Sequence, residues 1–140
     1  MKPIFGLIFL LLIDCSNEFN PVGAGPEFSL GTAFTATAGI VTSISGEQLT
    51  VQFITVSEDA RCPIDVQCVW SGNAKVGIRL AKADAGEQTI ELNTHLQPQT
   101  TDYLSYQIQL VTLGPQRTSE GTIKNSDYKA TLIIRKREES

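Results

Sequence analysis

Cys62 and Cys68 are the residues of this 140-residue chain whose type and spacing point most directly to chemistry. Five residues separate them, which permits a local disulfide that closes a compact loop, and Pro63 stiffens the loop by fixing its own φ. The chain contains no Cys-x-x-Cys spacing of the kind found in redox-active pairs. Once the chain is exported to an oxidising compartment, we expect a structural disulfide worth about 2 kcal/mol.

The same cysteines allow a metal site as an alternative, in which His95 and Asp65 would complete the four ligands of a zinc ion. That site, like a Cys–His nucleophile pair, needs free thiols, and a disulfide consumes both. His95 is the single histidine, and its Asn-, Gln- and Pro-containing surroundings indicate a surface loop. The acidic residues form no recognisable catalytic motif. We therefore expect no metal, no cofactor and no enzymatic activity.

Charged and aromatic residues flank the cysteines and make this segment the candidate ligand surface. An ion pair of Arg61 with Asp59 and Asp65 is the favoured role of the arginine, and binding of a carboxylate ligand is the alternative. Trp70 follows Cys68 by two residues, which places both on one face of an extended chain. We expect its indole to cover the disulfide and seal the core, with a stacking platform for sugar or peptide as the alternative. The candidate ligand-facing residues are Arg61, Asp65, Trp70 and His95.

This segment resembles a motif of uncharacterised small secreted proteins and lipoproteins of bacteria. The motif has an acidic residue, Arg-Cys-Pro, Val-x-Cys, a hydrophobic residue, Trp, a small residue and Gly. The matching residues here are Asp59, Arg61-Cys62-Pro63, Val66, Cys68, Val69, Trp70, Ser71 and Gly72. The motif is specific as a marker of that family, and the resemblance implies no particular activity.

Residues 1–14 indicate an export signal. Lys2 precedes an apolar stretch over residues 4–13, about half the length that spans a membrane and typical of a signal peptide. The stretch leads to Cys15 and resembles a bacterial lipoprotein signal, in which that cysteine becomes the acylated first residue of the mature protein. Leu12 matches the resemblance, whereas Ile13 and Asp14 differ from its usual small residues. We expect lipidation of Cys15, with ordinary secretion and an uncleaved anchor as alternatives.

Two segments follow the signal. Residues 15–27 carry Pro, Gly and polar residues without apolar periodicity, which predicts a flexible tether. Residues 28–140 alternate apolar and polar positions in short runs rich in Thr, Val and Ile, which predicts strands. About seven such runs predict an all-β domain, a single antiparallel β-sandwich of immunoglobulin-like architecture, with a small β-barrel as the alternative. The runs are residues 34–37, 40–44, 49–56, 74–80, 88–92, 106–113 and 128–134.

Three irregularities interrupt this pattern. Phe53 and Ile54 break the alternation and predict a bulge or burial on both faces. The connections over residues 93–102 and 114–127 are long, and loops on a rigid scaffold are where binding residues tend to lie. The second connection is long enough to contain a further short strand around Thr122 and Ile123.

Charge and composition narrow the function. A net charge of −4 argues against nucleic-acid binding, and 41% hydrophobic residues indicate a folded domain. We expect a monomeric lipoprotein anchored in the bacterial envelope that acts as a binding module for an envelope protein, peptide or carbohydrate. If the cell is Gram-negative, the expected membrane is the outer one, and both the periplasmic and the surface face stay open. An assembly accessory without a small ligand and a carboxylate-based enzyme are the alternatives. An exposed cluster of Trp70 with Tyr103 or Tyr106 would favour the binding module, and a buried Trp70 the accessory.

Overall fold

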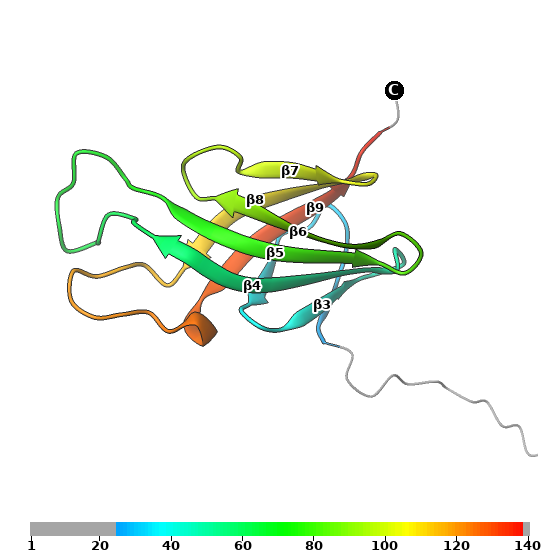
Figure 1. Cartoon of the computed structure of the whole chain (residues 1–140), viewed down its shortest axis with the longest axis horizontal. Coiled ribbons are helices and arrows are strands. Elements are labelled where there is room, and N and C mark those ends of the chain that lie inside the picture. The colour runs from blue at the N-terminus through cyan, green and yellow to red at the C-terminus, as the bar shows by residue number, and fades with distance from the viewer. Residues whose placement is uncertain (1–24, 139–140) are drawn as a thin grey trace, which may run out of the picture.

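The computed structural model describes residues 25–138, which form two β-sheets packed face to face (Figure 1). The strand order is β1-β3-β4-β5-β6 in the first sheet and β2-β9-β8-β7 in the second. All pairings are antiparallel except that of β1 with β3, and the sheets do not close into a barrel, so the predicted sandwich is confirmed. The elements are β1 (Glu27–Phe28), β2 (Phe34–Thr37), β3 (Val41–Ile44), β4 (Leu49–Asp59), β5 (Ala74–Lys82), β6 (Gly86–Asn93), β7 (Thr100–Tyr103), β8 (Tyr106–Gly114), the short 3₁₀ helix η1 (Asn125–Asp127) and β9 (Lys129–Lys136).

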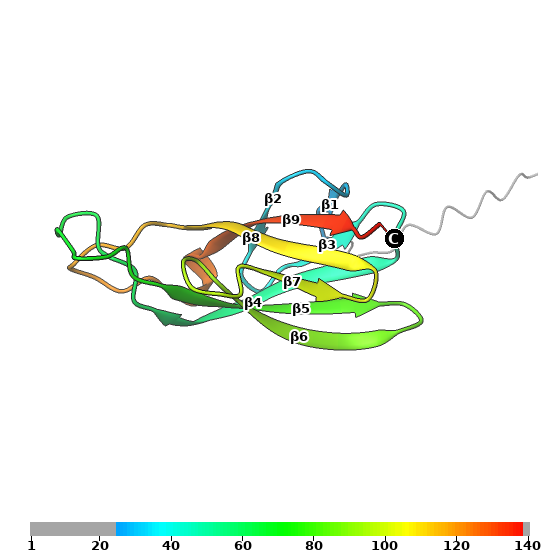
Figure 2. The ribbon, with the colours of Figure 1, turned by 90° about the horizontal axis from the view of Figure 1, so that it is seen from above.

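The core lies between the two layers and explains the alternation in the sequence. Successive side chains of a strand point to opposite faces, so every second residue faces the other sheet. Figure 2, viewed at right angles to Figure 1, shows β8 and β9 above β4, β5 and β6. The largest completely buried aliphatic and aromatic side chains come from these strands: Leu49, Val51, Phe53, Val76, Ile78, Leu80, Leu92, Tyr106, Ile108, Leu132 and Ile134.

The predicted irregularity in β4 is a bulge, because the pairing of β4 with β5 shifts register between Phe53 and Thr55. A second shift follows between Val56 and Glu58, and β8 has one between Leu110 and Thr112. The β4–β5 pairing nevertheless continues to Asp59 opposite Ala74. The long hairpin therefore carries the cysteine loop beyond the end of the sandwich (Figure 1).

Two strands lie outside the predicted runs. β7 overlaps the end of the predicted connection over residues 93–102 and extends one residue beyond it. Tyr103 is the only buried residue of β7, so its alternation is weak. β1 is two residues long and includes Glu27, which the sequence assigned to the tether. The strand considered around Thr122 and Ile123 is absent, and η1 lies nearby instead. The predicted signal, Cys15 and most of the tether lie outside the described residues.

Tyr103 and Tyr106 lie at the opposite end of the sandwich from the cysteine loop. The Tyr103 hydroxyl donates a hydrogen bond to the carbonyl of Gly86 in the β5–β6 turn at 2.9 Å. The Tyr106 hydroxyl donates to the carboxylate of Glu47 in the β3–β4 turn. Both rings are buried, so the exposed cluster of these tyrosines with Trp70 does not form.

Candidate functional site

The disulfide loop is an extension of the β4–β5 hairpin. The Ala60 N–H donates to the Asn73 carbonyl, and the Cys62 N–H donates to the Ser71 carbonyl, both at 2.8 Å. Above these two bonds the predicted Cys62–Cys68 disulfide is formed, with its Cα atoms 6.0 Å apart. The loop is thus closed at its base by backbone hydrogen bonds and higher up by a covalent link.

Arg61 fastens this hairpin to the second sheet. Its side chain is buried, with the residue 9% exposed. Its Nε and Nη2 donate to the two carboxylate oxygens of Asp59 at 2.8 and 2.7 Å, which confirms that ion pair. Nη1 donates to the Leu113 carbonyl at 2.7 Å, and Nη2 also donates to the Pro115 carbonyl at 3.0 Å. Because these bonds use four of the five guanidinium N–H groups, Arg61 has little capacity left for a carboxylate ligand.

Asp59 is the acceptor at the centre of this arrangement. Its carboxylate also receives a hydrogen bond from the Tyr128 hydroxyl at 2.9 Å. Burial alone would raise the pKa of Asp59, but hydrogen bonds from Arg61 and Tyr128 and the charge of Arg61 outweigh it and lower the pKa. Burial, together with the hydrogen bond to Asp59, raises the pKa of Tyr128 to about 12. Asp59 is therefore ionised, and Tyr128 is a donor, at neutral pH.

Asp65 has a different partner from the one predicted. Its carboxylate accepts hydrogen bonds from the Ser119 N–H at 2.8 Å and from the Ser119 hydroxyl, and these bonds lower its pKa. The Ile64 N–H donates to the Arg117 carbonyl at 2.9 Å, and Arg117 Nη1 donates to the Arg61 carbonyl at 3.0 Å. The predicted Arg61–Asp65 pair is wrong because the 114–127 connection folds against the disulfide loop and supplies these contacts.

Trp70 does not cover the disulfide, so the prediction that it seals the core is wrong. Its side chain is 57% exposed, and Cys68 is also exposed. The argument from alternation fails here because residues 69 and 70 form a bend rather than a strand. Ile64 and Val66 are 63% and 46% exposed, and Val69 is completely exposed. We call Ile64, Val66, Val69 and Trp70 the apolar tip.

His95 lies in an exposed position on the loop between β6 and β7, as predicted. The buried side chain of Asn73, which the sequence interpretation missed, holds this loop. Asn73 Oδ1 accepts from the His95 N–H at 2.9 Å and the Leu96 N–H at 3.1 Å. Asn73 Nδ2 donates to Asn93 Oδ1 at 2.8 Å. From the sequence, an Asn directly after Gly72 indicates only a turn. Its role could not be predicted because its hydrogen-bond partners lie about twenty residues later in the chain.

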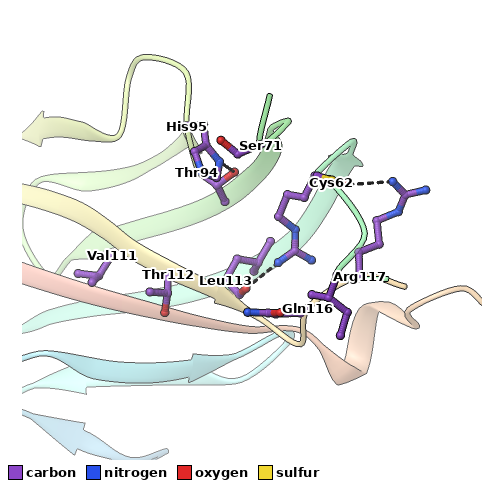
Figure 3. Close-up of a pocket in the computed structure, with 11 residues that line it drawn as sticks. Cys62, Ser71, Thr94, His95, Val111, Thr112, Leu113, Gln116 and Arg117 are labelled. Atoms are coloured by element: carbon purple, nitrogen blue, oxygen red, sulfur yellow. Dashed lines mark hydrogen bonds between the residues drawn. The ribbon is translucent and has the colours of Figure 1, made fainter. Parts of the chain in front are cut away.

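A pocket of about 380 Å³ lies where these loops meet (Figure 3). Its residues come from the disulfide loop, the β6–β7 loop, and β8 with the connection that follows it. They are Arg61, Cys62, Ile64, Ser71, Thr94, His95, Val111, Thr112, Leu113, Gln116 and Arg117. Arg117 was also missed by the sequence interpretation, since a single arginine in a polar loop carries no distinguishing signal.

The disulfide removes both thiols from metal or nucleophile chemistry. Among residues 25–138 no group of three His, Cys, Asp or Glu side chains is placed to hold a metal ion. The same part of the chain has no helix with the length and apolar character needed to cross a bilayer. Comparison with protein families, curated proteins and solved structures finds no match. The function must therefore be inferred from the geometry of this end.

Proposed function

We propose that this protein is a binding module of the bacterial envelope, tethered to a membrane through acylated Cys15, that contacts a protein partner through the apolar tip. The observation that carries the proposal is the exposure of four large apolar side chains on one cross-linked loop. Contiguous exposed apolar surface on a soluble domain marks interaction sites. Tryptophan in particular is enriched among the residues that dominate binding energies.

The shape and charge of the loop favour a partner with a concave apolar surface. The loop projects beyond the sandwich (Figure 1), so a complementary surface must be hollow. Its ionic groups are already engaged inside the protein, Arg61 by Asp59 and Asp65 by Ser119. Backbone bonds and the disulfide hold the loop in place, which lowers the cost of ordering it on binding.

The rival functions have less support. A buried Trp70 would have favoured an assembly accessory, but Trp70 is exposed. A carboxylate-based enzyme needs two close acidic side chains in its cleft. No Asp or Glu lines this pocket, and Asp59 is the single acidic residue that lines a smaller cavity of about 230 Å³. Self-association through two tips alone would bury less than the roughly 800 Å² per partner of a standard interface.

Trp70→Ser tests the role of the apolar tip. Detergent-solubilised protein is used to capture a partner from envelope extract, the partner is identified and purified, and its affinity is measured. We expect Trp70→Ser to weaken binding at least about tenfold, with an unchanged unfolding midpoint because the indole is exposed. Leu104→Ser, a half-exposed apolar residue in the β7–β8 turn, is the matched control and should bind normally. Equal affinity of both variants, or binding of the tip to lipid vesicles instead, would contradict the proposal.

Cys15→Ala tests the membrane tether. We expect the variant to leave the membrane fraction and to lose all labelling by a radioactive or clickable fatty acid, because the acyl chains are the anchor. The double variant Cys62→Ser and Cys68→Ser is the control and should keep both properties. If Cys15→Ala protein stays membrane-bound and labelled, the lipoprotein part of the proposal is wrong.

A further inference from the structure

We infer that the pocket at the disulfide end is a second recognition site, which takes a carboxylate attached to an apolar group and binds it through Arg117. This site adjoins the apolar tip and shares Ile64 with it, but Val66, Val69 and Trp70 do not line the pocket. The inference therefore goes beyond the proposed function and does not depend on a protein partner.

The charge of the pocket is opposite to that of the whole chain. The chain has 15 acidic residues and 11 Lys and Arg residues, yet the charged residues of the pocket lining are Arg61 and Arg117, with no acidic residue. Asp59 neutralises Arg61, and Asp59 lines a smaller cavity of about 230 Å³ that Arg117 also borders, not this pocket. A concave site lined by one sign of charge concentrates the opposite sign, so the pocket favours an anion.

Arg117 is the residue with guanidinium capacity to spare. One of its N–H groups donates to the Arg61 carbonyl, and no other side-chain hydrogen bond of Arg117 is formed within residues 25–138. In the same part of the chain no carboxylate lies within ion-pair distance of it. The bond to Arg61 and the Ile64 N–H bond to the Arg117 carbonyl hold the residue in place. The remaining N–H groups of this guanidinium are available to form the planar fork that matches a carboxylate.

The remaining lining indicates what the carboxylate is attached to. Ile64, Val111 and Leu113 provide an apolar wall, while Ser71, Thr112 and Gln116 provide neutral hydrogen-bonding groups. Figure 3 shows Thr112, Leu113 and Gln116 following one another along the β8 side of the pocket. The apolar wall and a single available guanidinium suit a monoanionic carboxylate better than a phosphate, which usually gathers several cations. The volume of about 380 Å³ is at the lower end of ligand sites and fits a small branched acid or the last residue of a peptide.

The test compares N-acetyl-leucine with its uncharged amide, N-acetyl-leucinamide. Ligand-observed NMR titration with the detergent-solubilised full chain measures both dissociation constants. We expect a value on the order of 1 mM for the acid and binding at least about tenfold weaker for the amide. The tripeptide acid N-acetyl-Ala-Ala-Leu distinguishes the two sources of this chemistry. Tighter binding of the tripeptide identifies a peptide C-terminus, and equal binding identifies a free small acid.

Variants then test whether Arg117 is the residue that binds the carboxylate of the ligand. Arg117→Gln should weaken N-acetyl-leucine binding about tenfold, whereas Arg135→Gln on the outer face of β9 should leave it unchanged. Trp70→Ser should bind the acid normally, which separates this site from the tip. Equal binding of acid and amide by the wild-type protein overturns the inference even if Arg117→Gln fails to fold. Undiminished acid binding by folded Arg117→Gln overturns it as well.

Discussion

Gly72→Ala is expected to lower the free energy of unfolding by about 4 kcal/mol. Gly72 is buried and has a φ of +71°, in the left-handed region that a residue with a Cβ rarely adopts. A Cβ here would overlap the Ala60 carbonyl oxygen and lie 2.8 Å from the Arg61 Cα. Because both neighbours are backbone atoms, they cannot move without breaking the bonds at the base of the loop. Urea unfolding without reductant measures the loss.

Gly46→Ala separates the two causes of this effect. Gly46 has a φ of +74°, but nothing lies within 4 Å of the position its Cβ would occupy. The variant should therefore lose only the conformational part, about 1 kcal/mol. If Gly72→Ala is no less stable than Gly46→Ala, the backbone at Ala60 moves aside and the close approach is not essential to the loop.

Arg61→Met is expected to cost about 3–5 kcal/mol at neutral pH. The substitution leaves the Asp59 carboxylate partly buried without its counter-charge and removes the donors to the Leu113 and Pro115 carbonyls. Lys75→Met is the matched control, since its ion pair with Glu58 is exposed and should contribute less than about 1 kcal/mol. Urea unfolding measures the loss of unfolding free energy in both variants. A similar loss in the two would show that Arg61 does not stabilise the contact between the sheets as its hydrogen bonds indicate.

The pH dependence of the Arg61→Met effect gives a second readout. The pKa of Asp59 in the folded protein lies below its ordinary value, because hydrogen bonds and the charge of Arg61 overcome the opposing effect of burial. Its stabilising contribution is therefore complete above the ordinary pKa and is lost as the pH falls through the folded-state pKa. The stability difference between wild type and Arg61→Met should be largest at pH 7 and should shrink in acid. A difference that is constant from pH 7 to pH 3 would contradict this assignment.

Hydrogen bonds from the β4–β5 hairpin join the segments at the disulfide end of the sandwich to one another. Arg61 joins the β4–β5 hairpin to the end of β8, Asp65 holds the following connection through Ser119, and Asn73 holds the β6–β7 loop. The end of β8, the connection after it and the β6–β7 loop line the pocket together with the disulfide loop, and each of them is held by a residue on the hairpin. Within the apolar tip, the Ile64 N–H also donates to the Arg117 carbonyl of that connection, whereas the Val66 N–H donates within the loop, to the Pro63 carbonyl. We expect tip variants to change binding without changing stability, and variants of the base to change both.

The long strands of the fold could be predicted from the sequence alone. Period-two alternation over residues 49–56, 74–80, 106–113 and 128–134 predicted four long strands. β4, β5 and β8 cover the first three ranges, and β9 covers the fourth except for Tyr128. The prediction succeeds because a strand that faces a core on one side must alternate. The Cys62–Cys68 disulfide could be predicted in the same way. The two cysteines are so close in sequence that their pairing does not depend on how distant segments fold.

Only the tertiary structure decided what surrounds the disulfide. Asp65 meets Ser119 across 54 residues, and Arg61 meets Leu113 across 52. Such contacts depend on how the connection after β8 folds back, which no local pattern encodes. Trp70 was misplaced for a related reason: the face of a side chain follows from alternation only in a strand, and the chain bends at this residue. The pocket and Arg117 became visible only when three segments far apart in the sequence met at one end of the sandwich.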